Sequence, residues 1–192
     1  MAELNADYWQ TRYETAQTGW DIGHVSAPLR RIINSLTDKA LRILVPGAGN
    51  GYEVEYLWQR GFHNLTVIDL AAAPLYRLRE RLPELPADHL IEGNYFDHAG
   101  AYDLQLEQTF FCALDPALRS AYVTQAHALL APGGRLRGVL FNRTFEQSGP
   151  PFGGSIVEYR ALFEPLFHLR ELAPCDHSES TRQEVRINFE RR

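Results

Sequence analysis

Several residue types and patterns are scarce in this sequence of 192 residues. The two cysteines, Cys112 and Cys175, lack the spacing of metal ligands, which argues against a disulfide scaffold or a zinc site. Lys39 is the only lysine, and the net charge of −5 leaves no excess of cations for a nucleic-acid backbone. No apolar run approaches the ~20 residues of a membrane span, and the first residues do not resemble a signal peptide. We therefore expect a cytoplasmic, monomeric protein that holds no metal and binds neither nucleic acid nor membrane.

Strand-like and helix-like segments alternate along the chain, and the composition, 45% hydrophobic and 22% charged, is that of a globular protein. Strands are expected over residues 41–45, 65–68, 89–92, 102–108, 134–141, 167–172 and 184–189, and helices over 5–16, 26–36, 52–60, 73–82, 117–130 and 155–163. This alternation predicts an α/β fold with a seven-stranded, mostly parallel, doubly wound sheet. The last strand follows its neighbour without a helix, so it should run antiparallel, at or near the sheet edge. We expect one domain over residues 1–192, with an N-terminal helical segment over 1–36 and a core over 41–192.

The strongest local signal is a glycine-rich loop that runs from Val45 to Gly51. It contains Gly47, Gly49 and Gly51, follows the first core strand and opens a helix, as a nucleotide-type cofactor site requires. Asp69 ends the next strand, 18 residues beyond Gly51, and is followed by Leu70. A carboxylate at that point typically accepts hydrogen bonds from two ribose hydroxyls. The pattern therefore predicts a cofactor with a ribose at the ends of the first two strands.

The spacing of the glycines bears on which cofactor binds. A dinucleotide-binding fingerprint would place a third glycine where Tyr52 stands. The looser spacing found here is typical of proteins that bind S-adenosylmethionine. A nicotinamide-dependent oxidoreductase remains an alternative on the glycine loop alone.

Further motifs give a more specific resemblance. They are Trp9, Tyr13 and Trp20-Asp21-Ile22-Gly23, the loop Val45 to Gly51, Phe110-Phe111-Cys112-Ala113, Leu130-Ala131-Pro132-Gly133-Gly134 and Gly149-Pro150-Pro151-Phe152. In this order and spacing the chain resembles the thiopurine methyltransferase family, particularly its plant and bacterial halide and thiol methyltransferases. The resemblance implies a Rossmann-like class I methyltransferase fold and S-adenosylmethionine as the cofactor. It also implies in-line methyl transfer to a small soft nucleophile such as a thiol, a halide or a thiopurine-like compound.

The resemblance also implies roles for individual residues. Trp9, Tyr13 and Trp20 would cover the cofactor as part of an N-terminal lid, which is the name used below for residues 1–36. Asn94 and Tyr95 would border the adenine, with Asp97 as the alternative acceptor, and Gln108 would contact the methionine part. Asn94 replaces an acid of the family pattern, and Glu107-Gln108 replaces an Asp-Tyr pair. These departures put the carry-over of substrate chemistry to Gln108 in doubt.

The acceptor pocket is expected to contain Phe110, Phe111 and Phe152. No catalytic triad is recognisable, and Asp21 and His24 are the only candidates for a proton acceptor, with loop capping as an equally good explanation of both. Two alternatives stay open. One is a methyltransferase for a metalloid or hydroxyl acceptor, and the other is a cofactor-binding protein that has lost catalysis.

Overall fold

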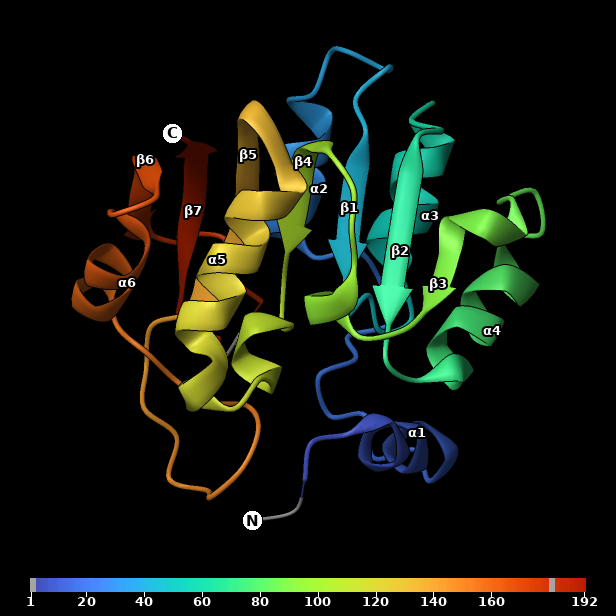
Figure 1. Cartoon of the computed structure of the whole chain (residues 1–192). Coiled ribbons are helices and arrows are strands. Elements are labelled where there is room, and N and C mark those ends of the chain that lie inside the picture. The colour runs from blue at the N-terminus through green and yellow to red at the C-terminus, as the bar shows by residue number, and fades with distance from the viewer. Residues whose placement is uncertain (1–2, 180–181) are drawn as a thin grey trace.

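The structure, a computed structural model, describes residues 3–179 and 182–192. Its centre is a seven-stranded sheet with the strand order β3-β2-β1-β4-β5-β7-β6 (Figure 1). The strands are β1 (Ile43–Pro46), β2 (Leu65–Asp69), β3 (Leu90–Glu92), β4 (Tyr102–Glu107), β5 (Leu130–Phe141), β6 (Phe167–Pro174) and β7 (Glu184–Arg191). The predicted doubly wound sheet is confirmed. Strand β5 begins four residues earlier than expected, because the Ala131-Pro132-Gly133 segment is part of the strand instead of a turn before it.

The direction of the strands also follows the prediction, with one refinement. Strands β1 to β5 pair in parallel, whereas β7 pairs antiparallel with both β5 and β6. The last strand therefore lies between β5 and β6, one position in from the edge that β6 forms. Strand β7 follows β6 without an intervening helix, so it pairs antiparallel with β6. Its other edge forms hydrogen bonds with β5.

Helices cover both faces of the sheet, because successive side chains of a strand point to opposite faces. On one face, Ile43 and Val45 of β1 pack against α2 (Ala27–Asn34), α3 (Tyr52–Gln59) and α4 (Ala72–Arg81). On the other face, Leu44 joins the cluster formed with α5 (Arg119–Leu129) and α6 (Ile156–Phe163). None of the helices in the described ranges is long and apolar enough to cross a bilayer.

The lid consists of α1 (Ala6–Glu14), α2 and the loop that joins them. The side chain of Asn5 caps α1 by accepting from the Tyr8 N–H at 3.0 Å, and Ser26 caps α2, which has Pro28 in its first turn. In Figure 1, α1 lies beyond the carboxyl ends of β1 and β2, next to the end of α4. The α1 part of the lid therefore lies at the end of the parallel sheet where ligands bind in this type of fold, whereas α2 packs on one face of the sheet.

The close approach of β4 and β5 depends on Gly138. A Cβ atom at this position would lie 1.8 Å from the carbonyl oxygen of Glu107. We expect Gly138→Ala to lower the melting temperature by roughly 2–12 °C, because overpacking of this kind costs about 1–3 kcal/mol. Differential scanning calorimetry measures this, with Gly149→Ala as the control, since no atom lies within 4 Å of its added Cβ. Equal melting temperatures for the two variants would contradict the prediction.

Candidate active site

A cavity of about 1440 Å³ lies between the lid and the carboxyl ends of the strands. The lid contributes Trp9, Tyr13 and Trp20 to its wall, and the strand ends contribute Gly47, Asp69, Leu70, Asn94 and Tyr95. Past these, the wall continues through Thr109, Phe110, Cys112, Phe141, Arg143, Phe145, Pro150, Pro151 and Arg182. The first group lies where the sequence predicts the cofactor, and the second group would surround an acceptor.

The three glycines of the loop all have left-handed backbone conformations, with φ of 56° at Gly47, 54° at Gly49 and 69° at Gly51. A Cβ at Gly47 would lie 2.2 Å from the Phe110 ring, so glycine is also required there by space. Gly47 lines the large cavity, whereas Gly49 lines a second cavity of about 50 Å³ behind the loop, and Gly51 precedes α3 and packs on Leu78. The loop thus leaves its backbone close to the large cavity at the beginning of α3.

Asp69 is the last residue of β2, and its carboxylate is 9% exposed. Burial raises its pKa to about 6, against the opposing effect of hydrogen bonds from the N–H groups of Ala71, Gly49 and Leu70. The bond from Ala71 to Oδ1 measures 3.0 Å. A buried acid at the cavity wall suits hydroxyl donors of a ligand, which would favour its charged form.

Asn94 and Tyr95 follow β3. The Asn94 Oδ1 accepts from the Phe96 N–H at 3.2 Å, and its Nδ2 donates to Asp97, which does not line the cavity. The Tyr95 ring stacks on Tyr122 at 5.6 Å, and its hydroxyl donates to Gln105 at 3.0 Å. Both predicted residues therefore lie in the wall, with Tyr95 held rigidly in place.

The lid aromatics form one cluster over the glycine loop. The Trp20 ring meets those of Trp9 and Tyr13 edge to face, at 5.7 Å and 5.6 Å. The Tyr13 hydroxyl and the Trp20 Nε1 lie 3.5 Å and 3.7 Å from the Cβ position of Gly49. Helix α1 is fixed to α4 by Gln10, whose side-chain oxygen accepts from the Ala73 N–H at 3.0 Å.

The end of β4 is organised by Glu107, whose role the sequence did not reveal. Its fully buried carboxylate accepts from the N–H groups of Phe110 (3.0 Å) and Phe111 (2.9 Å) and from the Tyr122 hydroxyl (2.6 Å). Burial raises its pKa to about 7. The sequence does show an acid at the end of an apolar strand, which is unusual. It does not show which groups donate hydrogen bonds to that acid.

Three predicted residues have other surroundings than expected. Gln108 lines the small cavity instead of the large one, and its Oε1 accepts from the Ser26 hydroxyl at 2.7 Å. Phe111 is 1% exposed and packs against Tyr122 and the α6 aromatics. The side chain of Phe152 is not part of the cavity wall, to which its neighbours Pro150 and Pro151 contribute. Of the three predicted phenylalanines, only Phe110 lines the large cavity.

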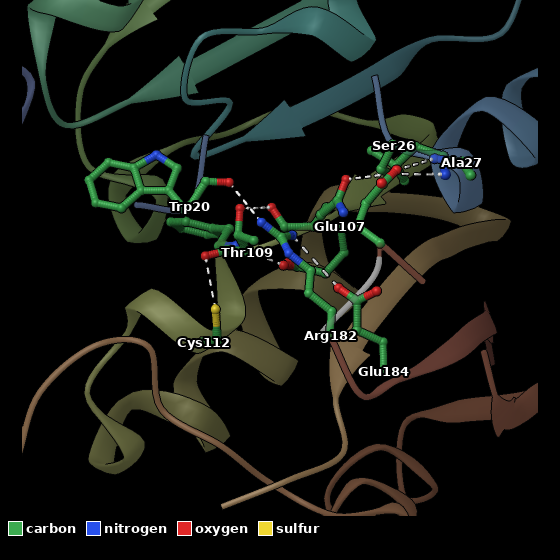
Figure 2. Close-up of polar contacts among 12 residues, drawn as sticks. Trp20, Ser26, Ala27, Glu107, Thr109, Cys112, Arg182 and Glu184 are labelled. Atoms are coloured by element: carbon green, nitrogen blue, oxygen red, sulfur yellow. Dashed lines mark hydrogen bonds and ion pairs between the residues drawn. The ribbon is translucent and has the colours of Figure 1, made fainter. Parts of the chain in front are cut away.

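Cys112 lies in the wall, and its thiol donates to the carbonyl of Thr109 at 3.2 Å (Figure 2). Burial raises the pKa of the thiol, and the Glu107 carboxylate adds to this effect. Asp21 and His24 line the small cavity, so the structure does not bring either side chain to the wall of the large one. In residues 3–179 and 182–192, no group of three or more His, Cys, Asp or Glu residues could hold a metal ion.

Arg182 connects the acceptor end of the cavity with the lid. Its Nη2 donates to the carbonyl of Trp20 at 2.7 Å, and its Nη1 lies 3.8 Å from Glu184 (Figure 2). Arg143 lines the same end, with its guanidinium 4.7 Å from the Phe145 ring centre.

Comparison with known proteins identifies the family. The family model for thiopurine S-methyltransferase matches residues 4–191. The chain belongs to this family. It is 28% identical to a protein named probable thiol methyltransferase 2 from Arabidopsis thaliana, over 86% of this chain and 75% of that protein. It is 26% identical to the thiopurine S-methyltransferase of Nitrosospira multiformis, over 90% of this chain and 87% of that protein.

Solved structures show the same fold. A Burkholderia thailandensis 1,6-didemethyltoxoflavin-N1-methyltransferase, solved with S-adenosylhomocysteine, aligns with a TM-score of 0.77 at 16% identity, over 97% of this chain and 86% of that one. The Rossmann-like class I methyltransferase fold is thereby confirmed. By its family the protein is an S-adenosylmethionine-dependent S-methyltransferase, and not the nicotinamide-dependent oxidoreductase that the glycine loop alone left open.

The residues present fit this cofactor. Gly47 of the glycine loop lines the cavity at a point where a Cβ would clash with the Phe110 ring, and Asp69 offers a carboxylate at the adjacent strand end. Asn94 lies where the sequence predicts the adenine, and its side-chain oxygen has a second lone pair beyond the one used by Phe96. The cavity is also large enough for a cofactor and an acceptor together.

The raised pKa of Asp69 generates a pH prediction. Ribose hydroxyls would favour the charged carboxylate, so the affinity for S-adenosylhomocysteine should be complete above a pH of about 6 and fall as the pH decreases through it. Asp69→Asn should weaken binding roughly tenfold or more at pH ~8 and remove the pH dependence between about pH 5 and 8. Calorimetric titration measures both, with the exposed Asp88→Asn as the control. The same pH dependence in the wild type and in Asp69→Asn would contradict the assignment.

Proposed function

We propose that the protein methylates the sulfur of small thiols, with hydrosulfide and halide-like anions as further acceptors. The observation that carries this proposal is the composition of the acceptor end of the cavity. Aromatic and proline side chains, among them Phe110, Phe141 and Pro150, alternate there with the guanidinium groups of Arg143 and Arg182. An apolar chamber with cations at one end suits a small, soft anion that loses its water easily.

The cofactor would be held by the first group of wall residues. The glycine-loop backbone and Asp69 would bind its ribose and amino-acid parts, Asn94 and Tyr95 its adenine, and the lid aromatics would cover it. When bound, S-adenosylmethionine supplies a methyl group on a sulfonium, with a neutral leaving group. The aromatic faces of Trp9, Tyr13 and Trp20 would stabilise that positive charge and exclude water.

The acceptor needs little proton chemistry from the chain. A thiol near neutral pH is partly ionised, and nearby guanidinium groups favour the thiolate further. The role left to the chain is to orient the thiolate towards the methyl group in a dry chamber, with Phe110 between the glycine loop and the acceptor end. This agrees with the placement of Asp21 and His24 outside the large cavity.

A cytoplasmic location belongs to the same proposal. Both cysteines are free thiols in the structure, as is usual in a reducing compartment. A monomeric state stays a prediction, which sedimentation equilibrium would test.

The acceptor class is tested by turnover. We expect formation of S-adenosylhomocysteine with hydrosulfide, small alkyl and aryl thiols and iodide, at rates that rise as the pH approaches the pKa of each thiol. Alcohols and amines with the same carbon skeletons are the matched controls and should give at most background rates. Turnover with an amine, hydroxyl or metalloid acceptor and with no thiol or halide would overturn the acceptor class and leave cofactor binding unaffected. Cofactor binding without turnover on any acceptor would favour a protein that has lost catalysis.

The lid is tested by removing its central aromatic. Trp20→Ala should raise the dissociation constant of S-adenosylhomocysteine roughly tenfold to hundredfold, because a large buried aromatic contact is lost. In the wild type, hydrogen exchange in residues 5–25 should slow when the ligand binds. Trp58→Ala is the control, since Trp58 lies on α3, outside the lid, and its ring packs against His63. Equal exchange with and without ligand would show that the segment is ordinary core.

A further inference from the structure

Asp21 joins the lid to the glycine loop. Its Oδ1 accepts from the N–H of Gly23 at 2.8 Å, which closes the turn after Trp20. Its Oδ2 accepts from the side-chain amide of Asn50 and lies 3.5 Å from the Tyr52 hydroxyl. Asn50 belongs to the glycine loop, and Tyr52 is the first residue of α3. One carboxylate therefore contacts two elements that are 29 and 31 residues away along the chain.

The partners of Asp21 are themselves braced by α4. The side chain of Arg81 donates to the carbonyl of Asn50, forms an ion pair with Glu55 at 2.6 Å and lies 5.1 Å from the centre of the Tyr52 ring. Asn50 and Tyr52 are thus held where they are by contacts that do not involve the lid. Asp21 meets a prearranged pair of donors, and only the lid side of the contact has to move when the cavity opens.

The neighbour of Asp21 in sequence is Trp20, the centre of the aromatic cluster. The Trp20 ring packs against the rings of Trp9 and Tyr13, and its carbonyl accepts a hydrogen bond from Arg182. The next residue, Asp21, joins this segment to Asn50 of the glycine loop. Asp21 lines the small cavity and not the large one, so it does not contact an acceptor in the large cavity. Its position is therefore that of a support for Trp20.

We propose that Asp21 is a positioning residue that holds the aromatic lid on the glycine loop through Asn50, and so sets how long the cofactor stays bound. This rests on the proposed function in one respect, namely that the lid covers the cofactor. A charge-assisted hydrogen bond between partly buried side chains is strong enough to affect the lifetime of the closed lid. The proposal assigns Asp21 a different role from the proton acceptor that the sequence suggested.

A double-mutant cycle tests the contact. Asp21→Ala and Asn50→Ala should each increase the dissociation rate of S-adenosylhomocysteine roughly tenfold, and the double variant should be no worse than the poorer single one. The exchanged pair Asp21→Asn with Asn50→Asp should recover part of the loss, because an amide again faces a carboxylate. Stopped-flow release of the ligand, followed by tryptophan fluorescence, measures all four variants. Additive effects in the cycle, or no recovery in the exchanged pair, would overturn the contact.

A second measurement separates positioning from proton transfer. With a saturating acceptor that is already a thiolate and with S-adenosylmethionine varied, Asp21→Ala should reduce kcat far less than it raises the KM for S-adenosylmethionine. A fall in kcat with an unchanged KM would overturn the proposal. The control is Asp38→Ala, because Asp38 accepts from the Ala40 N–H in a similar turn at an exposed site outside residues 1–36 and lines neither cavity. Melting temperatures of all variants show whether each is folded.

The outcome is separable from that of the proposed function. If Asp69→Asn weakens ligand binding and Asp21→Ala does not, the cofactor site stands and the role of Asp21 is wrong. If neither variant affects binding, the assignment of the cofactor site itself fails. If hydrogen exchange in residues 5–25 is unchanged by ligand while Asp21→Ala still alters release, Asp21 acts through the glycine loop and not through the lid, and the proposal is overturned.

Discussion

The carboxylate of Glu107 is the group on which both ends of the large cavity depend. Removing an acid from water is costly, and Glu107 meets that cost with three hydrogen bonds from Phe110, Phe111 and Tyr122. The two backbone bonds fix the turn that presents Phe110 and Cys112 to the acceptor end. The bond from Tyr122 continues through Gln105 to the hydroxyl of Tyr95 in the part of the wall proposed to bind adenine. The shape of the acceptor chamber and the position of Tyr95 are therefore coupled through one buried network.

Much of the fold followed from local sequence signals. The core strands could be predicted because short apolar runs alternate with helix-like segments, and the run of β1 ends at Pro46 and Gly47. The helices α1 and α2 begin at residues whose side chains cap them, Asn5 and Ser26. The glycine loop and Asp69 could be located because the geometry of the first two strands fixes the distance between them in sequence. The position of β7 between β5 and β6 is less local, since it depends on which free edge the returning strand meets.

The direction of individual side chains in the site was not predictable in the same way. Phe110 and Phe111 are adjacent in a short turn without a regular period, and the bonds to Glu107 determine that the first faces the cavity and the second the core. Gln108 is drawn to the small cavity by Ser26, a residue 82 positions away. Such contacts depend on chain segments that the fold brings together, and no spacing within one segment encodes them.

The Cys112 thiol has a consequence for an enzyme proposed to act on sulfur. It lies in the wall of the same cavity and would be a competing nucleophile if it were ionised. Burial raises its pKa, and the carboxylate of Glu107 opposes a second negative charge nearby. A thiol that stays protonated is a poor nucleophile, so Cys112 would not compete with an ionised acceptor for the methyl group of a cofactor bound in this cavity.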